Sequence, residues 1–178
     1  AGLGLHSLRP ASVAAADPPP AGESVLGMKF EPRDVVRIGI VGVGRRGMEH
    51  LIELLAIKKV EVKAICDIAK NRVMEAQARV RKAGQPEPGV YDNGERDFEN
   101  LCRRDDLDLV YIATPWNWHV PMAVAALDGG KHAAVEVPAA NTIDECWALV
   151  QASERNRRHC VILENCCYGY NEMLVLGM

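Results

Sequence analysis

The sequence lacks several features that would each have pointed to a class of function. No run of ~18 apolar residues occurs, so no segment is expected to span a membrane. The 21 Lys and Arg residues are scattered among 24 Asp and Glu residues, and the net charge of -3 argues against a nucleic-acid partner. None of the six cysteines belongs to a C-x-x-C pair, so no metal site is expected. The composition, 48% hydrophobic and 25% charged, is that of a globular domain.

The cysteines are expected to be structural. Cys146 and Cys160 lie in apolar segments, where a cysteine usually packs as a small hydrophobic side chain. The neighbours Cys166 and Cys167 are poorly placed to form a disulfide with each other, because that bond has a specific geometry.

The N-terminal stretch differs in composition from the rest. Small residues up to Ala16 precede a polar, proline-rich segment that starts at Asp17. This pattern is typical of the end of a secretory signal cleaved after Ala16, and equally of a disordered Ala/Pro linker. We expect residues 1–33 to lie outside the folded domain, residues 34–165 to form it, and residues 166–178 to begin a second domain of a longer protein.

Strands and helices are expected to alternate within the folded domain. Apolar runs predict strands at 35–41, 60–66, 107–113, 132–137 and 160–164. Helical spacing or capping signals predict helices at 48–58, 68–83, 98–103, 120–127 and 142–156, and prolines mark 84–93 as a loop. Alternation of this kind implies parallel pairing through right-handed crossovers. The predicted fold class is therefore α/β, a Rossmann-type doubly wound parallel sheet.

A glycine-rich turn, GVGRRG, follows the first predicted strand and opens the first predicted helix. Gly42 permits the tight turn, Gly44 lets the backbone approach a phosphate, and Gly47 lets the helix pack on the strand. The helix N-terminus offers unpaired amides to an anion, and Arg45 and Arg46 are expected to add charge there. In this context the turn predicts the pyrophosphate site of an NAD-type cofactor.

Asp67 ends the second predicted strand. A carboxylate at this place accepts hydrogen bonds from the adenosine ribose and repels a 2′-phosphate, which favours NAD over NADP. Arg72 lies close by in the sequence and would soften that discrimination. The alternative role for Asp67 is a helix N-cap for the segment that follows it.

Further polar groups follow the carboxyl ends of later strands, where open α/β sheets bind ligands. The sequence TPWNWH begins at Thr114 and offers the ring of Trp116 for stacking and the titratable His119. Two other interpretations stay open: the tryptophans pack a domain interface, or His119 caps a helix. Glu136 either faces the nicotinamide or is an exposed acid.

Asn165 and Tyr168 follow the last predicted strand on the same rim. A tyrosine there can hydrogen-bond a sugar or transfer a proton, and it can equally pack under a following domain. Tyr170 is a weaker candidate for the same roles.

Taken together, these blocks resemble the Gfo/Idh/MocA oxidoreductases over about residues 34–178. The shared features are the glycine turn, the Ile-Ala-Thr-Pro run followed by His119, the Gly-Lys-His run, and Glu-x-Pro at Glu136. The resemblance implies NAD as the cofactor and a C-terminal α+β domain, at whose start this chain would be truncated. Typical members carry a catalytic lysine where this chain has Val137, which argues against simple alcohol dehydrogenation.

A narrower resemblance accounts for the valine. The runs HAAVEVPAA from His132, ECWALV from Glu145 and LENCCYG from Leu163 are similar to glycoside hydrolase family 109. Its type activity is an NAD-dependent α-N-acetylgalactosaminidase. The resemblance implies oxidation of the sugar at C3, elimination of the aglycone, addition of water and re-reduction, so that NAD is not consumed. Ordinary glycosidases use two flanking carboxylates instead.

The resemblance also implies roles for individual residues. Tyr168 would reach toward the sugar, and His119 is the other catalytic candidate; further catalytic groups would lie in the C-terminal domain. Cofactor contacts are expected from Gly42, Gly44, Arg45, Arg46, Gly47, Asp67, Thr114, Trp116, His119, Glu136 and Asn165.

The expected partner is a small-molecule glycoside, with homo-oligomers forming through the C-terminal domain. Export by a twin-arginine route is one implied location, and the cytoplasm is the other. Two rival functions stay open: an NAD-dependent sugar dehydrogenase of the wider family, and an NAD-binding module without catalysis.

Overall fold

A computed structural model describes residues 22–29 and 32–164 of the chain, and the structural statements below concern those residues. The predicted cleavage after Ala16 and the predicted site residues Asn165 and Tyr168 lie outside this part, so they stay predictions. The vicinal cysteines and Tyr170 lie outside it too.

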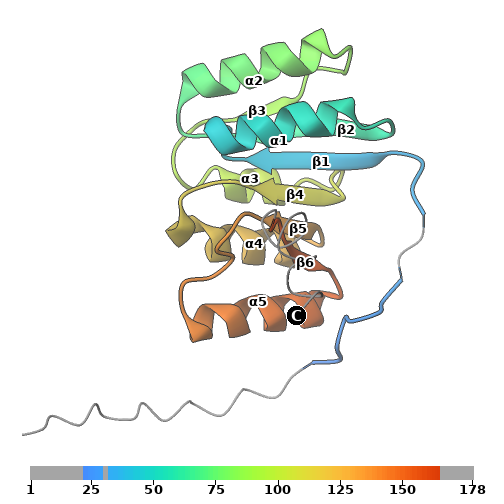
Figure 1. The fold of residues 1–178 in the computed structure, drawn as a ribbon, viewed down its shortest axis with the longest axis vertical. Helices are drawn as coiled ribbons and strands as arrows, with labels where there is room; N and C mark the ends of the chain where they lie inside the picture. Colours follow the sequence, from blue (N-terminus) through green and yellow to red (C-terminus); the bar gives the residue numbers. More distant parts are fainter. Residues whose placement is uncertain (1–21, 30–31, 165–178) are drawn as a thin grey trace, which may run out of the picture.

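One six-stranded sheet forms the centre of the domain, and helices cover both of its faces (Figure 1). The strands are β1 (Val36–Val41), β2 (Val60–Cys66), β3 (Gly89–Tyr91), β4 (Leu109–Ile112), β5 (His132–Val135) and β6 (Cys160–Ile162). Their order in the sheet is β3-β2-β1-β4-β5-β6, and all neighbours pair in parallel. The direction of winding reverses between β1 and β4, and ligands of such folds bind at this switch point. The predicted doubly wound α/β fold is confirmed.

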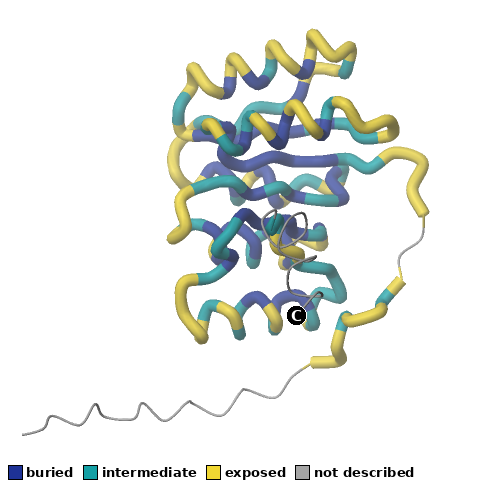
Figure 2. Tube along the Cα trace, in the orientation of Figure 1, coloured by how far each residue is buried: buried dark blue, intermediate teal, exposed yellow. Residues whose placement is uncertain are grey.

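The helices divide into two groups, and each group covers its own hydrophobic core. The helices are α1 (Arg45–Ala56), α2 (Lys70–Lys82), α3 (Phe98–Cys102), the short 3-10 helix η1 (Trp116–Trp118), α4 (His119–Asp128) and α5 (Ile143–Asn156). α1 and α2 pack with Ile40 and Ile65 on one face of the sheet. α3, α4 and α5 pack with Val41 and Ile112 on the other. Ile40 and Val41 are neighbours in β1, so one strand supplies both cores. The buried colour of this strand is seen in Figure 2.

Several element boundaries differ from the prediction by a few residues, and two differences are larger. β3 lies inside the segment expected to be a loop, because it is a short edge strand whose pairing with Ala64–Cys66 of β2 leaves no alternating pattern of its own. α1 begins at Arg45, directly after the N-cap Gly44, whereas apolar spacing becomes visible only from Met48. The helix therefore starts at the glycine turn itself.

The start of α5 is as predicted. The Thr142 hydroxyl accepts a hydrogen bond from the Glu145 amide at 3.2 Å, and the Glu145 carboxylate accepts one from the Asn141 amide at 2.7 Å. This is a capping box with its return bond shifted by one residue.

The expectation of buried cysteines is wrong for Cys146. Its side chain is exposed on the outer face of α5, where Ile143 is 71% exposed as well. Cys160 is half-buried, and burial raises the pKa of its thiol to about 11, which makes it inert.

In the part of the chain that the structure describes, no helix combines the length and apolar character needed to cross a membrane. The same residues contain no group of three or more His, Cys, Asp or Glu side chains arranged to hold a metal ion.

Candidate cofactor site

The glycine turn between β1 and α1 leaves no room for a side chain at Gly42 or at Gly47. Gly42 has a φ of +84°, and a Cβ there would lie 2.6 Å from the Ala113 carbonyl oxygen. A Cβ on Gly47 would lie 1.8 Å from the carbonyl oxygen of Gly42. A Cβ on Gly44 would meet only the Arg72 guanidinium, at 3.2 Å. Two glycines therefore shape the turn, and the third leaves its backbone bare toward the adjoining cleft, as a bound phosphate requires.

Asp67 is fixed by two backbone amides at the end of β2. One carboxylate oxygen accepts from the Val43 amide and the other from the Ala69 amide, each at 2.8 Å. The N-cap of α2 is Ala69, so Asp67 supports the start of that helix without being its N-cap. A carboxylate oxygen can accept more than one hydrogen bond, so both oxygens keep capacity for ribose hydroxyls. Asp67 therefore orients the glycine turn and also presents an acid to the cleft.

A cleft opens at the carboxyl ends of β1, β2 and β4, at the switch point of the sheet. Four of the predicted cofactor residues line it: Gly42, Gly44, Asp67 and Thr114. Arg72 and Trp118 also line it, although neither was among the predicted contacts. The Trp118 ring packs edge-on against Phe98, with ring centroids 5.9 Å apart. Trp116 is 62% exposed and lies outside the cleft lining, so the two tryptophans of η1 have different environments.

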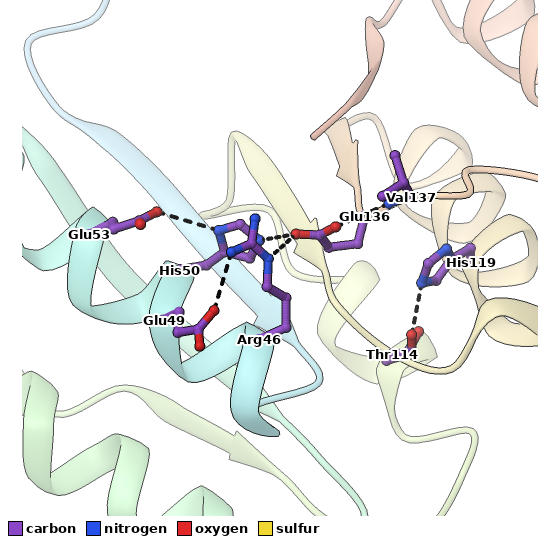
Figure 3. Close-up of polar contacts among 8 residues, drawn as sticks. All are labelled: Arg46, Glu49, His50, Glu53, Thr114, His119, Glu136 and Val137. Atoms are coloured by element: carbon purple, nitrogen blue, oxygen red, sulfur yellow. Dashed lines mark hydrogen bonds and ion pairs between the residues drawn. The ribbon is translucent and has the colours of Figure 1, made fainter. Parts of the chain in front are cut away.

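A second cluster joins α1 to the end of β5 (Figure 3). One Glu136 oxygen lies 2.5 Å from Arg46 Nε and 2.5 Å from His50 Nε2, and the other accepts from the Val137 amide at 3.1 Å. Glu136 is only 8% exposed. Burial alone would raise the pKa of its carboxyl, but the hydrogen bonds from Arg46, His50 and the Val137 amide outweigh burial and lower it. Glu136 is therefore a fixed, ionised carboxylate and not the exposed acid considered above.

His50 was missed by the sequence analysis. It is 6% exposed, and its ring lies against Tyr111 with centroids 5.7 Å apart. The signal that could have found it is its spacing, because Arg46 and His50 are four residues apart and share one face of α1. Its Nδ1 faces Glu53 at 3.6 Å, so this ring lies between two carboxylates.

The two arginines of the turn do not face the cleft. The Arg46 guanidinium is shared between Glu136 and Glu49, with distances of 2.5 and 3.2 Å. Arg45 is exposed and does not line the cleft. The structure thus places Arg46 with Glu136, as a pair near the end of β5, and neither arginine lines the cleft.

His119 connects two loops beneath the rim. It is 1% exposed, and its Nδ1 lies 2.7 Å from the Pro138 carbonyl oxygen. Its Nε2 lies 2.8 Å from the Thr114 carbonyl oxygen (Figure 3). Both ring nitrogens are thus directed at the backbone. This arrangement positions the turn that carries Thr114, and the catalytic role of His119 stays a prediction.

The comparison with known families agrees with this geometry. Residues 36–163 match the model of the Gfo/Idh/MocA oxidoreductase family, described as an NAD-binding Rossmann fold. The chain belongs to this family. The predicted family and the predicted cofactor, NAD, are thereby confirmed.

Relatives with higher similarity carry a narrower name. A protein from Saccharopolyspora erythraea is 52% identical over 100% of this chain, and one from Solibacter usitatus is 51% identical over 88% of it. Both are named "Glycosyl hydrolase family 109 protein". The chain covers 39% and 36% of their lengths, so it corresponds to less than half of each relative.

Solved structures share the fold. An NAD-binding protein from Listeria innocua superposes with a TM-score of 0.64 at 25% identity, covering 80% of this chain and 41% of that one. A scyllo-inositol dehydrogenase from Lactobacillus casei, solved with NAD(H) and scyllo-inositol, gives 0.66 at 23% identity, with 80% and 41% covered.

Proposed function

We propose that this domain is the cofactor-binding part of an NAD-dependent glycosidase that acts on α-N-acetylgalactosaminides and regenerates its cofactor in each cycle. The observation that carries the proposal is Val137, which stands next to the fixed carboxylate of Glu136 where the wider family typically has a catalytic lysine. The names of relatives that are 44–52% identical to this chain support the same conclusion.

Val137 contributes only its backbone to the site. Its amide donates to Glu136 at 3.1 Å, and its side chain has no group that can accept or donate a proton. Oxidation of a sugar hydroxyl, whether net or transient, needs a base for the hydroxyl proton. Position 137 supplies none, so the site departs from the wider family's pattern and the base of the proposed cycle comes from elsewhere in the protein.

The residues of this domain hold and orient the reactants. Bound NAD would supply the acceptor for a hydride from the sugar and return that hydride at the end of the cycle. The glycine turn and Asp67 fit its pyrophosphate and ribose. Glu136, ionised and fixed by Arg46 and His50, places a negative charge at the end of β5. His119 holds the turn of Thr114 in place.

The test uses the full-length protein, an aryl α-N-acetylgalactosaminide and NAD in catalytic amount. We expect release of the aryl group without net NADH. In D2O the released sugar should carry deuterium at C2, because elimination removes that proton and the later addition of water replaces it from solvent. Protein stripped of NAD is the matched control and should regain activity when NAD is added back.

Other outcomes would assign a different function. Stoichiometric NADH without cleavage would identify a sugar dehydrogenase. Bound NAD with neither reaction would leave a cofactor-binding module. Cleavage that needs no NAD and leaves C2 without deuterium would indicate ordinary two-carboxylate hydrolysis.

A further inference from the structure

Arg72 occupies the wall of the cofactor cleft that faces the glycine turn. It lies in the first turn of α2, directly after β2 and Asp67. Its Nη1 is the nearest atom to the place where a Cβ of Gly44 would be, at 3.2 Å. Gly44 is the glycine whose bare backbone opens onto the cleft, and Arg72 lines that cleft as well. The guanidinium therefore lies over the part of the turn that is built for a phosphate.

Arg72 and Arg46 differ in whether their guanidinium groups have ion-pair partners. Arg46 is neutralised by Glu136 and Glu49. Within residues 22–29 and 32–164, the guanidinium of Arg72 has no hydrogen-bond acceptor and no ion-pair partner. An unpaired guanidinium keeps its N–H donors and its full charge for a ligand. Arg72 is thus the cation that the cleft can offer to an anion.

We propose that Arg72 binds the pyrophosphate of the dinucleotide from the α2 side, and so supplies the positive charge that the sequence pattern had assigned to Arg45 and Arg46. The planar fork of a guanidinium matches two phosphate oxygens, which suits this role. The position over Gly44 distinguishes the pyrophosphate from a 2′-phosphate, because Asp67 presents its carboxylate where the ribose hydroxyls are expected. The assignment concerns the cofactor alone and is independent of the sugar chemistry proposed above.

Calorimetric titration of the full-length protein with ADP, adenosine and adenosine 2′-phosphate tests the proposal. ADP carries the diphosphate, adenosine carries no phosphate, and adenosine 2′-phosphate carries a phosphate only on the 2′ oxygen. Arg72→Gln should weaken ADP binding roughly tenfold, which corresponds to the loss of one charge-assisted hydrogen bond, and should leave adenosine unchanged. Arg72→Lys should give an intermediate ADP affinity, because it keeps the charge and loses the fork.

The matched control is Arg79→Gln on the same helix. Arg79 pairs with Glu75 on the exposed side of α2, so its loss changes the net charge equally without touching the cleft. We expect its ADP affinity to equal that of the wild type. An ADP affinity unchanged in Arg72→Gln would overturn the proposal. Equal losses for adenosine would indicate stacking on the base, and a loss confined to adenosine 2′-phosphate would indicate a role in NADP binding; either result would overturn it too.

Discussion

Single residues of the glycine turn are held by backbone contacts as well as by their own conformations. Gly47 lies against the Gly42 carbonyl, and the Asp67 carboxylate accepts a hydrogen bond from the amide of Val43, in the middle of the turn. The shape of the phosphate site is therefore set by the protein before a cofactor binds. Such preorganisation reduces the free-energy cost of ordering the site on binding.

We predict that Gly47→Ala destabilises the domain and abolishes NAD binding. The new methyl group would overlap a backbone carbonyl oxygen at 1.8 Å, so α1 must move away from β1, at a cost of about 3 kcal/mol or more. Urea unfolding gives the free energy, and NAD titration gives the affinity. Gly44→Ala is the control for stability alone, because its methyl group meets only the end of the flexible Arg72 side chain, although the methyl group should still weaken NAD binding. Equal urea midpoints for Gly47→Ala and wild type would show that the turn can relax.

The sequence was sufficient to predict where the glycine turn and Asp67 lie, because their places depend on backbone geometry within one local motif. The partners of Arg46 could not be predicted in the same way. Its ion pair with Glu136 joins residues 90 apart, and nothing near either residue indicates the other. The pairing of Arg46 with Glu136 was therefore not foreseen, and the predicted contacts of Arg45 and Arg46 with the cofactor stay predictions.

Elements were predictable where their own pattern was long enough. α5 carries a capping box and several turns of helical spacing, and it begins where expected. β3 is three residues long and is defined by its pairing with β2, so local sequence could not reveal it. Such short strands are determined by their contacts with neighbouring elements. One contact of this kind joins β5 to the residue before β6, and its effect on stability can be measured as a function of pH.

We predict that His132, at the start of β5, makes the domain less stable as the pH falls from 6.5 toward 4. Its Nδ1 accepts a hydrogen bond from the His159 amide at 3.0 Å, which requires an unprotonated nitrogen. Burial first, and then Arg158, lower the pKa of His132 from 6.5 to about 4. The unfolded chain therefore binds a proton in this pH range that the folded chain does not bind. Stability should fall by ~1–2 kcal/mol across the range, because solvent screens the partly exposed ring.

Urea unfolding at a series of pH values measures this effect. His132→Asn keeps an acceptor near the His159 amide but does not titrate, so its stability should stay flatter between pH 6.5 and 4.5. Glu136, whose pKa is lowered from 4.5, loses its stabilisation only below that pH and does not confuse the comparison. Parallel profiles for variant and wild type would contradict the assignment to His132.

At the scale of the whole molecule, the cofactor site draws on both halves of the sheet. β1, β2 and the helices α1 and α2 contribute the glycine turn, Asp67 and Arg72. On the other side of the switch point, β4 leads to Thr114, which also lines the cleft, and β5 leads to Glu136, whose contact with the cofactor stays a prediction. The domain has its own pair of cores, so its cofactor affinity should not depend on a second domain.

We predict that the 178-residue chain binds NAD but releases no aryl group from an aryl glycoside. NAD at about 100 times its Kd should stabilise the fold by ~2.7 kcal/mol, which raises Tm by roughly 5–10 °C. A thermal melt with and without NAD measures the shift, and NADP is the control, with a smaller shift expected because Asp67 repels a 2′-phosphate. Absence of a shift, or turnover by this chain alone, would contradict the prediction.

The hydrogen bonds between α1 and Glu136 join a part of the chain that is synthesised early to one that is synthesised late. Ribosomes make the glycine turn and α1 first, and Glu136 follows Arg46 by 90 residues. A carboxylate that enters the protein interior alone would lose its hydration without compensation. In the folded protein, Arg46 and His50 on α1 compensate Glu136 for that loss. The first helix to be synthesised thus carries the two groups that a much later strand needs for its carboxylate.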